Sequence, residues 1–453
     1  MEQLSLFYSL KFKPPAVIAF FGGGGKTSLM RVLAEEMALS DHKVLLTTTT
    51  KIYPYRGMPH FYLEENRDMI KELKKHFSSH NLAVIGYPPS PDGKIRGIDN
   101  DYIKIIFETL QVSVLVEADG SKGKPIKGFA DYEPVIPDCS DLLIPVIGAD
   151  ALGAEINNKT VHRPELLRVI TGSKDSKPAS LGEADLAKVY CRMTLIGKNQ
   201  ASKAKTIYVL NKYDLLNAPS KAHSIAKLMV NYNCRGRFLV TETLGANPVK
   251  MNLRLDNNQE AVSVSCIILA AGQSSRMGKD KLSLYFRDST ILGETVKQVS
   301  NAGFDELILV TKPNSHWKDI LRNYDIKIVE NPAYMEGQAT SLIAGLRKVD
   351  PCTQGILFAL GDQPLIKSST YKSLVKTYRN NLKPVTYPLY REKRGNPVII
   401  DRSIWPELLN LKGDQGGRSF IKKLEPGCLN PVDTADAAVL LDIDTAEDYK
   451  MHK

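Results

Sequence analysis

The sequence predicts an α/β protein with two domains, each built on a parallel β-sheet that is covered by helices. Three observations support this prediction. Short apolar runs recur along the chain and are followed by segments of helical periodicity, which is the rhythm of β–α–β units. This rhythm stops at a polar segment and then starts again. The chain also has 453 residues, which is too long for a single hydrophobic core.

The interruption falls at residues 250–260, Lys-Met-Asn-Leu-Arg-Leu-Asp-Asn-Asn-Gln-Glu, a polar segment that lacks the pattern of a buried strand. We therefore predict one domain over residues 1–250 and a second over residues 262–453.

The composition narrows the class of protein. Hydrophobic residues make up 43% and charged residues 24%, as in ordinary globular chains. The net charge of +10 is spread along the chain and favours small anionic substrates over nucleic acid. The six cysteines include no Cys-x-x-Cys pair, which argues against a disulfide framework or a structural zinc site. We expect a cytoplasmic protein, because we find neither a signal peptide nor an apolar run as long as a membrane span.

The first apolar run, residues 15–21, leads into a glycine-rich loop and then into a helical pattern. This order of strand, glycine loop, Lys-Thr and helix is the context of a P-loop, in which Lys26 would reach the β- and γ-phosphates and Thr27 would bind Mg²⁺. Phe20 stands where the standard pattern has its first glycine, so we expect the turn to begin at Gly22. The alternative is a glycine-rich turn at a helix start. The predicted nucleotide-binding residues are Gly23, Gly24, Gly25, Lys26, Thr27 and Ser28.

Another apolar run, residues 112–116, ends in two acidic residues. Glu117 and Asp119 are two positions apart, so they lie on one face of the predicted strand. Carboxylates at such a strand end hold Mg²⁺ in P-loop proteins, and we predict that both acids share a Mg²⁺ site with Thr27. The alternative is a solvated acidic turn. The cationic loop 121–127 that follows would meet an acidic ligand or only water.

Two further segments bear on this site. Residues 47–50 are four threonines at a predicted strand end, which reflect β-propensity or present hydroxyl groups to phosphate or metal. The apolar run 206–210 enters Asn211-Lys212-Tyr213-Asp214, which has the Asn-Lys-x-Asp form of guanine-reading loops. An Asp carboxylate matches two adjacent N–H donors on guanine that adenine lacks. We predict that Asn211, Lys212 and Asp214 bind nucleotide, with GTP and ATP both open as the ligand.

The glycine loop, Thr47–Lys51, the acidic turn with its Ser-Lys-Gly, and Asn211–Asp214 together resemble the YqeC family, accessory proteins in the maturation of selenium-dependent molybdenum hydroxylases. The resemblance covers roughly the first 240 residues. The motifs themselves predict a P-loop NTPase-like domain. The resemblance implies a maturation pathway more than a reaction, with a molybdenum hydroxylase as the partner.

The second half begins on a strand, residues 264–269, followed by a loop without bulky side chains, Gly272-Gln273-Ser274-Ser275. Such a loop lets backbone amides point at an anion, and Arg276 and Lys281 add positive charge beside it. We interpret it as a cradle for a nucleoside triphosphate. The alternative is a Gly/Ser turn with two solvated cations.

Two acidic strand ends are predicted downstream. The apolar run 356–360 places Asp362 at the carboxyl end of a strand, where open α/β sheets bind ligands. Residues 440–445 repeat this form, with Asp442 and Asp444 on one face and Asp444 nearer the end.

Three loops complete the predicted site. Residues 336–341 open a helix and either read a base or phosphate or only cap that helix. Residues 394–397 and 413–418 are suited to a second anionic substrate.

These motifs resemble the molybdenum cofactor cytidylyltransferases, with MocA-type proteins nearest. The matching stretches are Leu-Ala-Ala-Gly-x-Ser-x-Arg-Met-Gly, Lys-Leu, Gly-Gln-x-x-Ser-Leu, Gly-Asp-Gln-Pro, Arg-Gly-Asn-Pro and Asp-Ile-Asp-Thr-x-Glu-Asp-Tyr. The resemblance implies a Rossmann-like MobA/MocA-type nucleotidyltransferase sheet that transfers CMP from CTP to the terminal phosphate of molybdopterin. Cytidylyl members carry Ala-Ala-Gly where guanylyl members carry Ala-Gly-Gly, so Ala270-Ala271-Gly272 favours CTP. Members commonly have His where Asn396 stands.

The predicted roles follow from charge. A phosphate nucleophile is already ionised, so the difficulty is to bring two polyanions together. Mg²⁺ between Asp362 and Asp444 would screen their repulsion. The predicted catalytic residues are Arg276, Lys281, Asp362 and Asp444. The predicted nucleotide-binding residues are Leu269, Ala270, Ala271, Gly272, Gly337 and Ser341.

Two other functions stay open. One is a different cytidylyl- or sugar-phosphate nucleotidyltransferase. The other is a GTP-switched chaperone that inserts cofactor into a hydroxylase.

Overall fold

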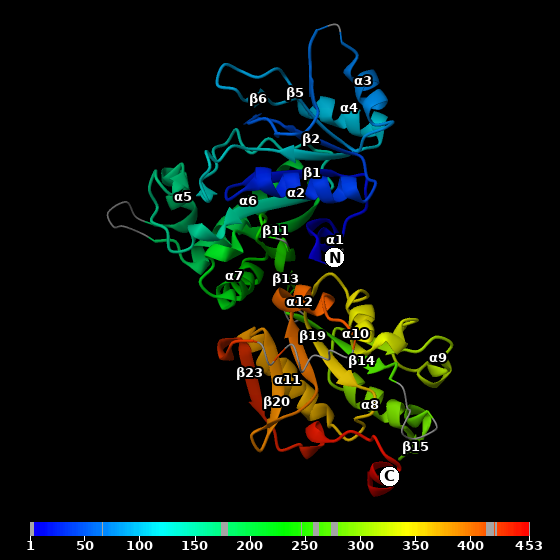
Figure 1. The fold of residues 1–453 in the computed structure, drawn as a ribbon. Helices are drawn as coiled ribbons and strands as arrows, with labels where there is room; N and C mark the ends of the chain where they lie inside the picture. The colour runs from blue at the N-terminus through cyan, green and yellow to red at the C-terminus, as the bar shows by residue number, and fades with distance from the viewer. Residues whose placement is uncertain are drawn as a thin grey trace. The chain divides into compact units, whose positions relative to one another are not determined.

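The computed structural model describes residues 4–65, 67–173, 180–245, 247–256, 262–272, 280–413, 421 and 424–452. The chain divides into two compact units, Glu2–Ala261 and Val262–Lys453, and each has its own large β-sheet (Figure 1). Among the helices in the described ranges, none is long and apolar enough to cross a bilayer.

The N-terminal unit is built on a sheet with the strand order β13-β12-β11-β9-β1-β7-β2-β5-β4. Its neighbouring strands are parallel except β12 and β13, so the carboxyl ends of the parallel strands meet at one edge. The strands are β1 Val17–Gly22, β2 Val44–Thr48, β4 His60–Tyr62, β5 Leu82–Gly86, β7 Ser113–Glu117, β9 Leu142–Gly148, β11 Lys205–Asn211, β12 Gly236–Thr241 and β13 Val249–Leu255. Two short pairs stand apart, β3 Lys51–Ile52 with β6 Ile95–Arg96, and β8 Ile126–Lys127 with β10 Val161–His162.

Helices cover this sheet and bury both of its faces. On one face, Leu33 of α2 clusters with Ile18 and Leu46. On the other face, Leu73 of α3 and Ile103 of α4 cluster with the neighbouring strand residues. Burial on both faces explains why the central strands are continuous apolar runs in the sequence. The helices are α1 Leu6–Leu10, α2 Lys26–Leu39, α3 Met69–His76, α4 Asn100–Leu110, α5 Pro164–Thr171, α6 Glu183–Gln200 and α7 Pro219–Asn231.

The expectation that residues 250–260 lack a buried strand is wrong for their first half. Residues 250–255 lie within β13, the antiparallel edge strand beside β12. Met251, Leu253 and Leu255 are buried, and Lys250 is partly exposed. Residues 251–255 do alternate apolar and polar residues, as a strand with one buried face does, but the high polar content of the segment hid this pattern. Asn252, at one of the polar positions, is itself fully buried.

The C-terminal unit is built on a sheet with the order β18-β17-β14-β19-β22-β20-β21, with β23 also paired to β20. The strands from β18 to β19 are parallel, and β22 runs antiparallel to β19. The strands are β14 Ser263–Ala270, β17 Glu306–Thr311, β18 Lys327–Glu330, β19 Thr353–Leu360, β20 Val385–Tyr390, β21 Lys393–Arg394, β22 Val398–Asp401 and β23 Leu429–Asp433, with a separate pair β15 Tyr285–Phe286 and β16 Ser289–Thr290. The helices are α8 Ile291–Ser300, α9 Trp317–Ile320, α10 Gln338–Leu346, α11 Ser368–Asn381, α12 Trp405–Leu409 and α14 Ala446–His452.

The expectation that residues 440–445 form a strand is also wrong. A 3-10 helix, η8 (Ala437–Leu440), ends at this segment, residues 441–445 are irregular, and α14 follows. Leu440 and Leu441 are 36% and 40% exposed, so the apolar pair that suggested a buried strand is not buried in the core. Ile443 is the buried residue of this segment.

Candidate nucleotide sites

The glycine loop between β1 and α2 forms a tight cradle. Gly22, Gly24 and Gly25 have φ angles of 106°, 77° and 107°, a region that favours glycine. The space at Gly24 is also closed, because a Cβ there would lie 2.0 Å from the backbone nitrogen of Gly148. The turn begins at Gly22, and its backbone conformation requires glycine at these positions.

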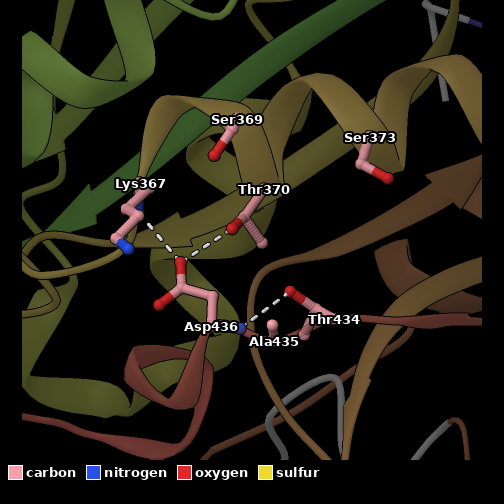
Figure 2. A pocket seen from close by; sticks show the side chains of 7 residues that line it. All are labelled: Lys367, Ser369, Thr370, Ser373, Thr434, Ala435 and Asp436. Atoms are coloured by element: carbon pink, nitrogen blue, oxygen red, sulfur yellow. Dashed lines mark hydrogen bonds between the residues drawn. The ribbon is translucent and has the colours of Figure 1, made fainter.

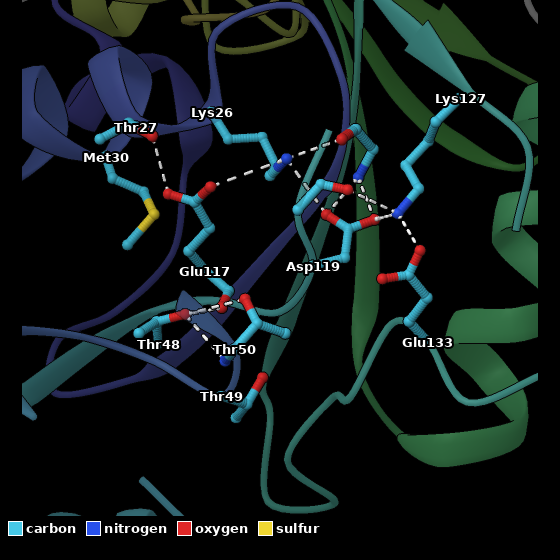
Figure 3. Close-up of polar contacts among 12 residues, drawn as sticks. Lys26, Thr27, Met30, Thr48, Thr49, Thr50, Glu117, Asp119, Lys127 and Glu133 are labelled. Carbon is cyan, nitrogen blue, oxygen red and sulfur yellow. Dashed lines mark hydrogen bonds and ion pairs between the residues drawn. The ribbon is translucent and has the colours of Figure 1, made fainter. Parts of the chain in front are cut away.

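Lys26 follows this cradle and lies among carboxylates (Figure 3). Its Nζ is 3.1 Å from Asp119 Oδ1 and 3.8 Å from Glu117 Oε1, and it donates to the carbonyl oxygen of Gly22 at 2.6 Å. Burial lowers the pKa of Lys26, but the charges of Asp119 and Glu117 outweigh this effect and the pKa is raised. Lys26 is therefore a buried, charged ammonium at the base of the loop.

Glu117 and Asp119 have different surroundings. Glu117 accepts a hydrogen bond from the Thr27 hydroxyl at 2.8 Å, and burial raises its pKa although Lys26 opposes this. Asp119 is fully buried and accepts from the backbone amide of Gly22 at 2.9 and 3.0 Å. Glu117 and Thr27 thus place two oxygen ligands side by side, whereas Asp119 is surrounded by N–H donors.

The ion pairs continue from Asp119 to residues that the sequence analysis did not assign. Lys127 Nζ lies 3.1 Å from Asp119 Oδ2 and also contacts Glu133, which in turn pairs with Arg163. The cationic loop 121–127 was expected to meet an acidic ligand or water, but its Lys127 side chain has no exposed surface. The sequence did contain a sign of this burial, because the apolar residues Ile126 and Phe129 lie on either side of Lys127.

The threonines at the end of β2 use their hydroxyl groups within the protein. Thr47 donates to the carbonyl oxygen of Ile85, Thr48 to that of Glu117 and Thr49 to that of Val135. These bonds attach the end of β2 to its surroundings.

The Asn-Lys-x-Asp segment lies beside the glycine loop. The Asn211 amide donates to the carbonyl oxygen of Gly24 at 2.9 Å, and its side-chain oxygen accepts from the hydroxyls of Thr241 and Thr243. Lys212 Nζ is 2.6 Å from Asp150. Asp214 is exposed, within the 3-10 helix η3 (Tyr213–Leu215). The structure therefore brings together two motifs that are far apart in the sequence.

In the C-terminal unit, one cavity of about 470 Å³ lies at the carboxyl ends of β14 and β19. It gathers all six residues predicted to bind nucleotide in this unit and three of the four predicted catalytic residues. The cavity is lined by Leu269, Ala270, Ala271, Gly272, Lys281, Leu282, Tyr334, Met335, Gly337, Gln338, Ser341, Leu360, Asp362, Asp442 and Asp444.

Lys281 lies between the two predicted metal-binding acids. Its Nζ is 2.6 Å from Asp362 Oδ2 and 2.6 Å from Asp444 Oδ1. Burial lowers the pKa of Lys281, but the two carboxylates outweigh this effect and the pKa is raised. Both acids therefore contact a single cationic group.

Backbone contacts place Asp444 beside Asp362. The amide of Ile443 donates to the carbonyl oxygen of Asp362 at 3.1 Å, and Gln363 Nε2 donates to Asp442 at 2.7 Å. Asp448 accepts from the amides of Asp444 and Thr445 and from the Thr445 hydroxyl. The sequence analysis did not assign Gln363 or Asp448; the Thr445–Asp448 spacing is that of a helix-capping pair.

Some predicted residues lie outside the described ranges, namely Arg276 with the rest of 273–279 and most of the loop 413–418. In the loop 394–397, which was predicted to suit a second anionic substrate, the Arg394 guanidinium lies 4.9 Å from the centre of the Tyr387 ring. No cluster of three or more His, Cys, Asp or Glu side chains that suits a metal occurs among the described residues. Asp362 and Asp444 form a pair.

A smaller hollow of about 240 Å³ lies at the start of α11 (Figure 2). Asp436 accepts there from the backbone amide of Lys367 at 3.0 Å and from the Thr370 hydroxyl at 2.7 Å. These contacts satisfy donors at the helix start, and no predicted site residue lines this hollow.

Comparison with known proteins agrees with the division into two parts. The YqeC protein family matches residues 18–165. The uncharacterized protein YqeC of Escherichia coli K12 is 32% identical over 204 residues, which cover 44% of this chain and 77% of that protein. The chain belongs to the YqeC family.

A second match, to the MobA-like NTP transferase domain, covers residues 266–427 of this YqeC-family chain. The molybdenum cofactor cytidylyltransferase of Escherichia coli K12 is 29% identical over 189 residues, 41% of this chain and 94% of that protein. A crystal structure of Rv0371c from Mycobacterium tuberculosis H37Rv is 30% identical and covers 42% of this chain and 97% of that one, with a TM-score of 0.36. Both resemblances stated from the motifs are confirmed, and the C-terminal unit is a MobA-like nucleotidyltransferase.

Proposed function

We propose that the C-terminal unit transfers CMP from CTP to the terminal phosphate of molybdopterin, forming the cytosine dinucleotide and pyrophosphate. The convergence of Lys281, Asp362 and Asp444 on the cavity that Leu269–Gly272 lines carries this proposal. The similarity to a molybdenum cofactor cytidylyltransferase over 94% of its length supports the choice of acceptor.

The residues fit a divalent cation. Asp362 and Asp444 each contact the same ammonium nitrogen, so their oxygens already surround one cationic position. Hard carboxylate oxygens are the ligands that Mg²⁺ prefers. Mg²⁺ held by these two acids would neutralise charge on the phosphates. Lys281 carries the protein's own positive charge at the same place.

The choice of CTP is based on the end of β14. Ala270 and Ala271 are each 4% exposed and line the cavity together with Gly272. The methyl group of Ala271 occupies space that a glycine would leave open, which favours the smaller pyrimidine base.

The test is pyrophosphate release from molybdopterin with CTP or GTP, in the presence of Mg²⁺. The proposal expects release with CTP and its loss in Asp362→Ala. Release with GTP alone would overturn the choice of nucleotide. Turnover with a sugar phosphate but not with molybdopterin would instead establish the alternative acceptor.

We propose that the N-terminal unit is a P-loop NTPase-like domain that binds Mg²⁺–GTP and serves as an accessory domain for a molybdenum hydroxylase. The contact of Asn211 with Gly24 supports this, because it places the exposed Asp214 on the segment that adjoins the glycine loop. Titration of the full chain with GTP and ATP tests it. A preference for GTP that disappears in Asp214→Ala is the expected result, and equal binding of both nucleotides would exclude a guanine-reading loop.

A further inference from the structure

The two acids after β7 differ in how many of their oxygen lone pairs are occupied. Asp119 receives the Gly22 amide on both oxygens, Lys26 on Oδ1 at 3.1 Å and Lys127 on Oδ2 at 3.1 Å (Figure 3). A carboxylate offers about four lone-pair sites, and three donor groups, one of them shared between both oxygens, occupy most of them. Glu117 instead contacts the Thr27 hydroxyl on one oxygen, and its other oxygen is 3.8 Å from Lys26.

The neighbouring charges also make Asp119 a poorer ligand for a cation than Glu117. A divalent cation bound to Asp119 would lie next to two buried ammonium groups, and like charges at such distances repel strongly inside a protein. Glu117 is adjacent to one of those ammonium groups, Lys26, which is also the group expected to turn toward phosphates. Its neighbour Thr27 supplies a second hard oxygen.

Lys127 has the contacts of a permanent partner for Asp119. Its side chain has no exposed surface, donates to the carbonyl oxygen of Gly120 at 2.8 Å and pairs with Glu133. Burying an ammonium is costly unless it is paired and hydrogen-bonded, and Lys127 has both two carboxylate partners and a carbonyl acceptor. The charges alternate along one network, which consists of Glu117, Lys26, Asp119, Lys127, Glu133 and Arg163.

We infer that Glu117 and Thr27 hold the divalent cation of the N-terminal nucleotide site, while Asp119, held by Lys127, positions the glycine loop through Gly22. This inference rests on the proposed nucleotide binding of this unit. When Lys26 contacts phosphates, Lys127 remains as the charge partner of Asp119. Glu117 therefore acts through the metal, and Asp119 and Lys127 act on the phosphate cradle whether or not a metal is bound.

The experiment is calorimetric titration of the full chain with GTP, and with ATP in parallel, in excess Mg²⁺ and in EDTA. For each nucleotide, the informative quantity is the Kd in EDTA divided by the Kd in Mg²⁺. In Glu117→Gln this ratio is expected to fall to about one, because the Mg²⁺-dependent gain in affinity is lost. In Asp119→Asn and Lys127→Met, the Kd is expected to rise about 10-fold or more in both buffers, with the ratio unchanged.

Controls separate these effects from misfolding. Lys124→Met removes a cation from the same loop and is expected to leave both Kd values unchanged, because its Nζ donates to the carbonyl oxygen of Lys159 and, among the described residues, pairs with neither Asp119 nor Glu133. Lys127→Arg keeps the charge and should recover part of the affinity. Should Lys127→Met fail to fold, the Kd ratio in Asp119→Asn is sufficient to test whether Asp119 holds the cation.

Two results would overturn the inference: loss of the Mg²⁺-dependent gain in Asp119→Asn, or wild-type affinity in Lys127→Met. The proposed function fails in a different way, since wild-type chain would then bind neither nucleotide in either buffer, and the inference would fail with it.

Discussion

The backbone amide of Ile443 donates a hydrogen bond to the carbonyl oxygen of Asp362 at 3.1 Å. This contact and the bond from Gln363 Nε2 to Asp442 join the irregular segment before α14 to the residues that follow β19. They set Asp444 next to Asp362, so that both carboxylates reach Lys281. The pair of acids is therefore built by a backbone bond across the cavity edge, and we expect it to be sensitive to changes on either side.

Asp444→Asn tests the role of this pair in nucleotidyl transfer. Removing one of the two carboxylates proposed to hold the cation should weaken the neutralisation of phosphate charge in the transition state and lower kcat/KM by about 100-fold or more. Initial rates of pyrophosphate release measure this effect. Asp433→Asn is the matched control, because it removes an exposed carboxylate from β23. A variant at position 444 with the control's rate would show that the second acid has no catalytic part.

Removal of divalent cations should stop the transfer reaction and leave the fold intact. Asp362 and Asp444 supply the oxygens for the cation, and Lys281 already compensates their charge in the protein without metal. We expect EDTA to abolish pyrophosphate release and added Mg²⁺ to restore it, with unchanged circular dichroism. Full activity after exhaustive chelation would refute the proposed metal role.

Gly24→Ala and Gly93→Ala separate backbone strain from steric closure. The two glycines have φ angles of 77° and 76°, but only the space at Gly24 is filled; nothing lies within 4 Å of a Cβ at Gly93. Both changes carry the φ penalty of about 1–2 kcal/mol. Gly24→Ala should in addition abolish GTP binding, because its Cβ would meet the backbone of Gly148. Urea unfolding and titration with GTP measure the two effects; similar GTP affinity in both variants would contradict a rigid cradle.

Asp401 predicts a pH dependence of stability in the C-terminal unit. It is buried, and burial raises its pKa above 3.8 although Tyr378, Ser403 and Gln354 donate hydrogen bonds to it. The folded state then holds this proton more tightly than the unfolded state. The free energy of unfolding should therefore fall as the pH rises above 3.8 and level off above the folded pKa.

Asp401→Asn should flatten this part of the profile, because the amide does not titrate. Urea unfolding followed at a series of pH values measures the slope, and Asp433→Asn serves as the exposed control. An equal slope in wild-type protein and Asp401→Asn would show that the buried acid is not the source.

Sequence patterns were sufficient to predict those elements whose conformation is determined by neighbouring residues in the chain. The apolar run before Gly22 and the helical pattern after Lys26 predicted β1, the glycine loop and α2, because strand, turn and helix preferences act over a few neighbouring residues. The same holds for β14 and for Asp362 at the end of β19. The strand β13 was missed although its apolar residues alternate with polar ones, because a short, polar-rich segment resembles a linker until its pairing with β12 is known.

The sequence by itself determined two α/β units, the motifs at the carboxyl ends of their strands and the two families that these motifs resemble. Only the tertiary structure decided that Asp444 comes from an irregular segment and that Lys127 is a buried partner of Asp119. The physical reason is that burial and ion pairing are set by residues distant in the chain. A backbone bond such as that from Ile443 to Asp362 has no signature in the local pattern of either segment.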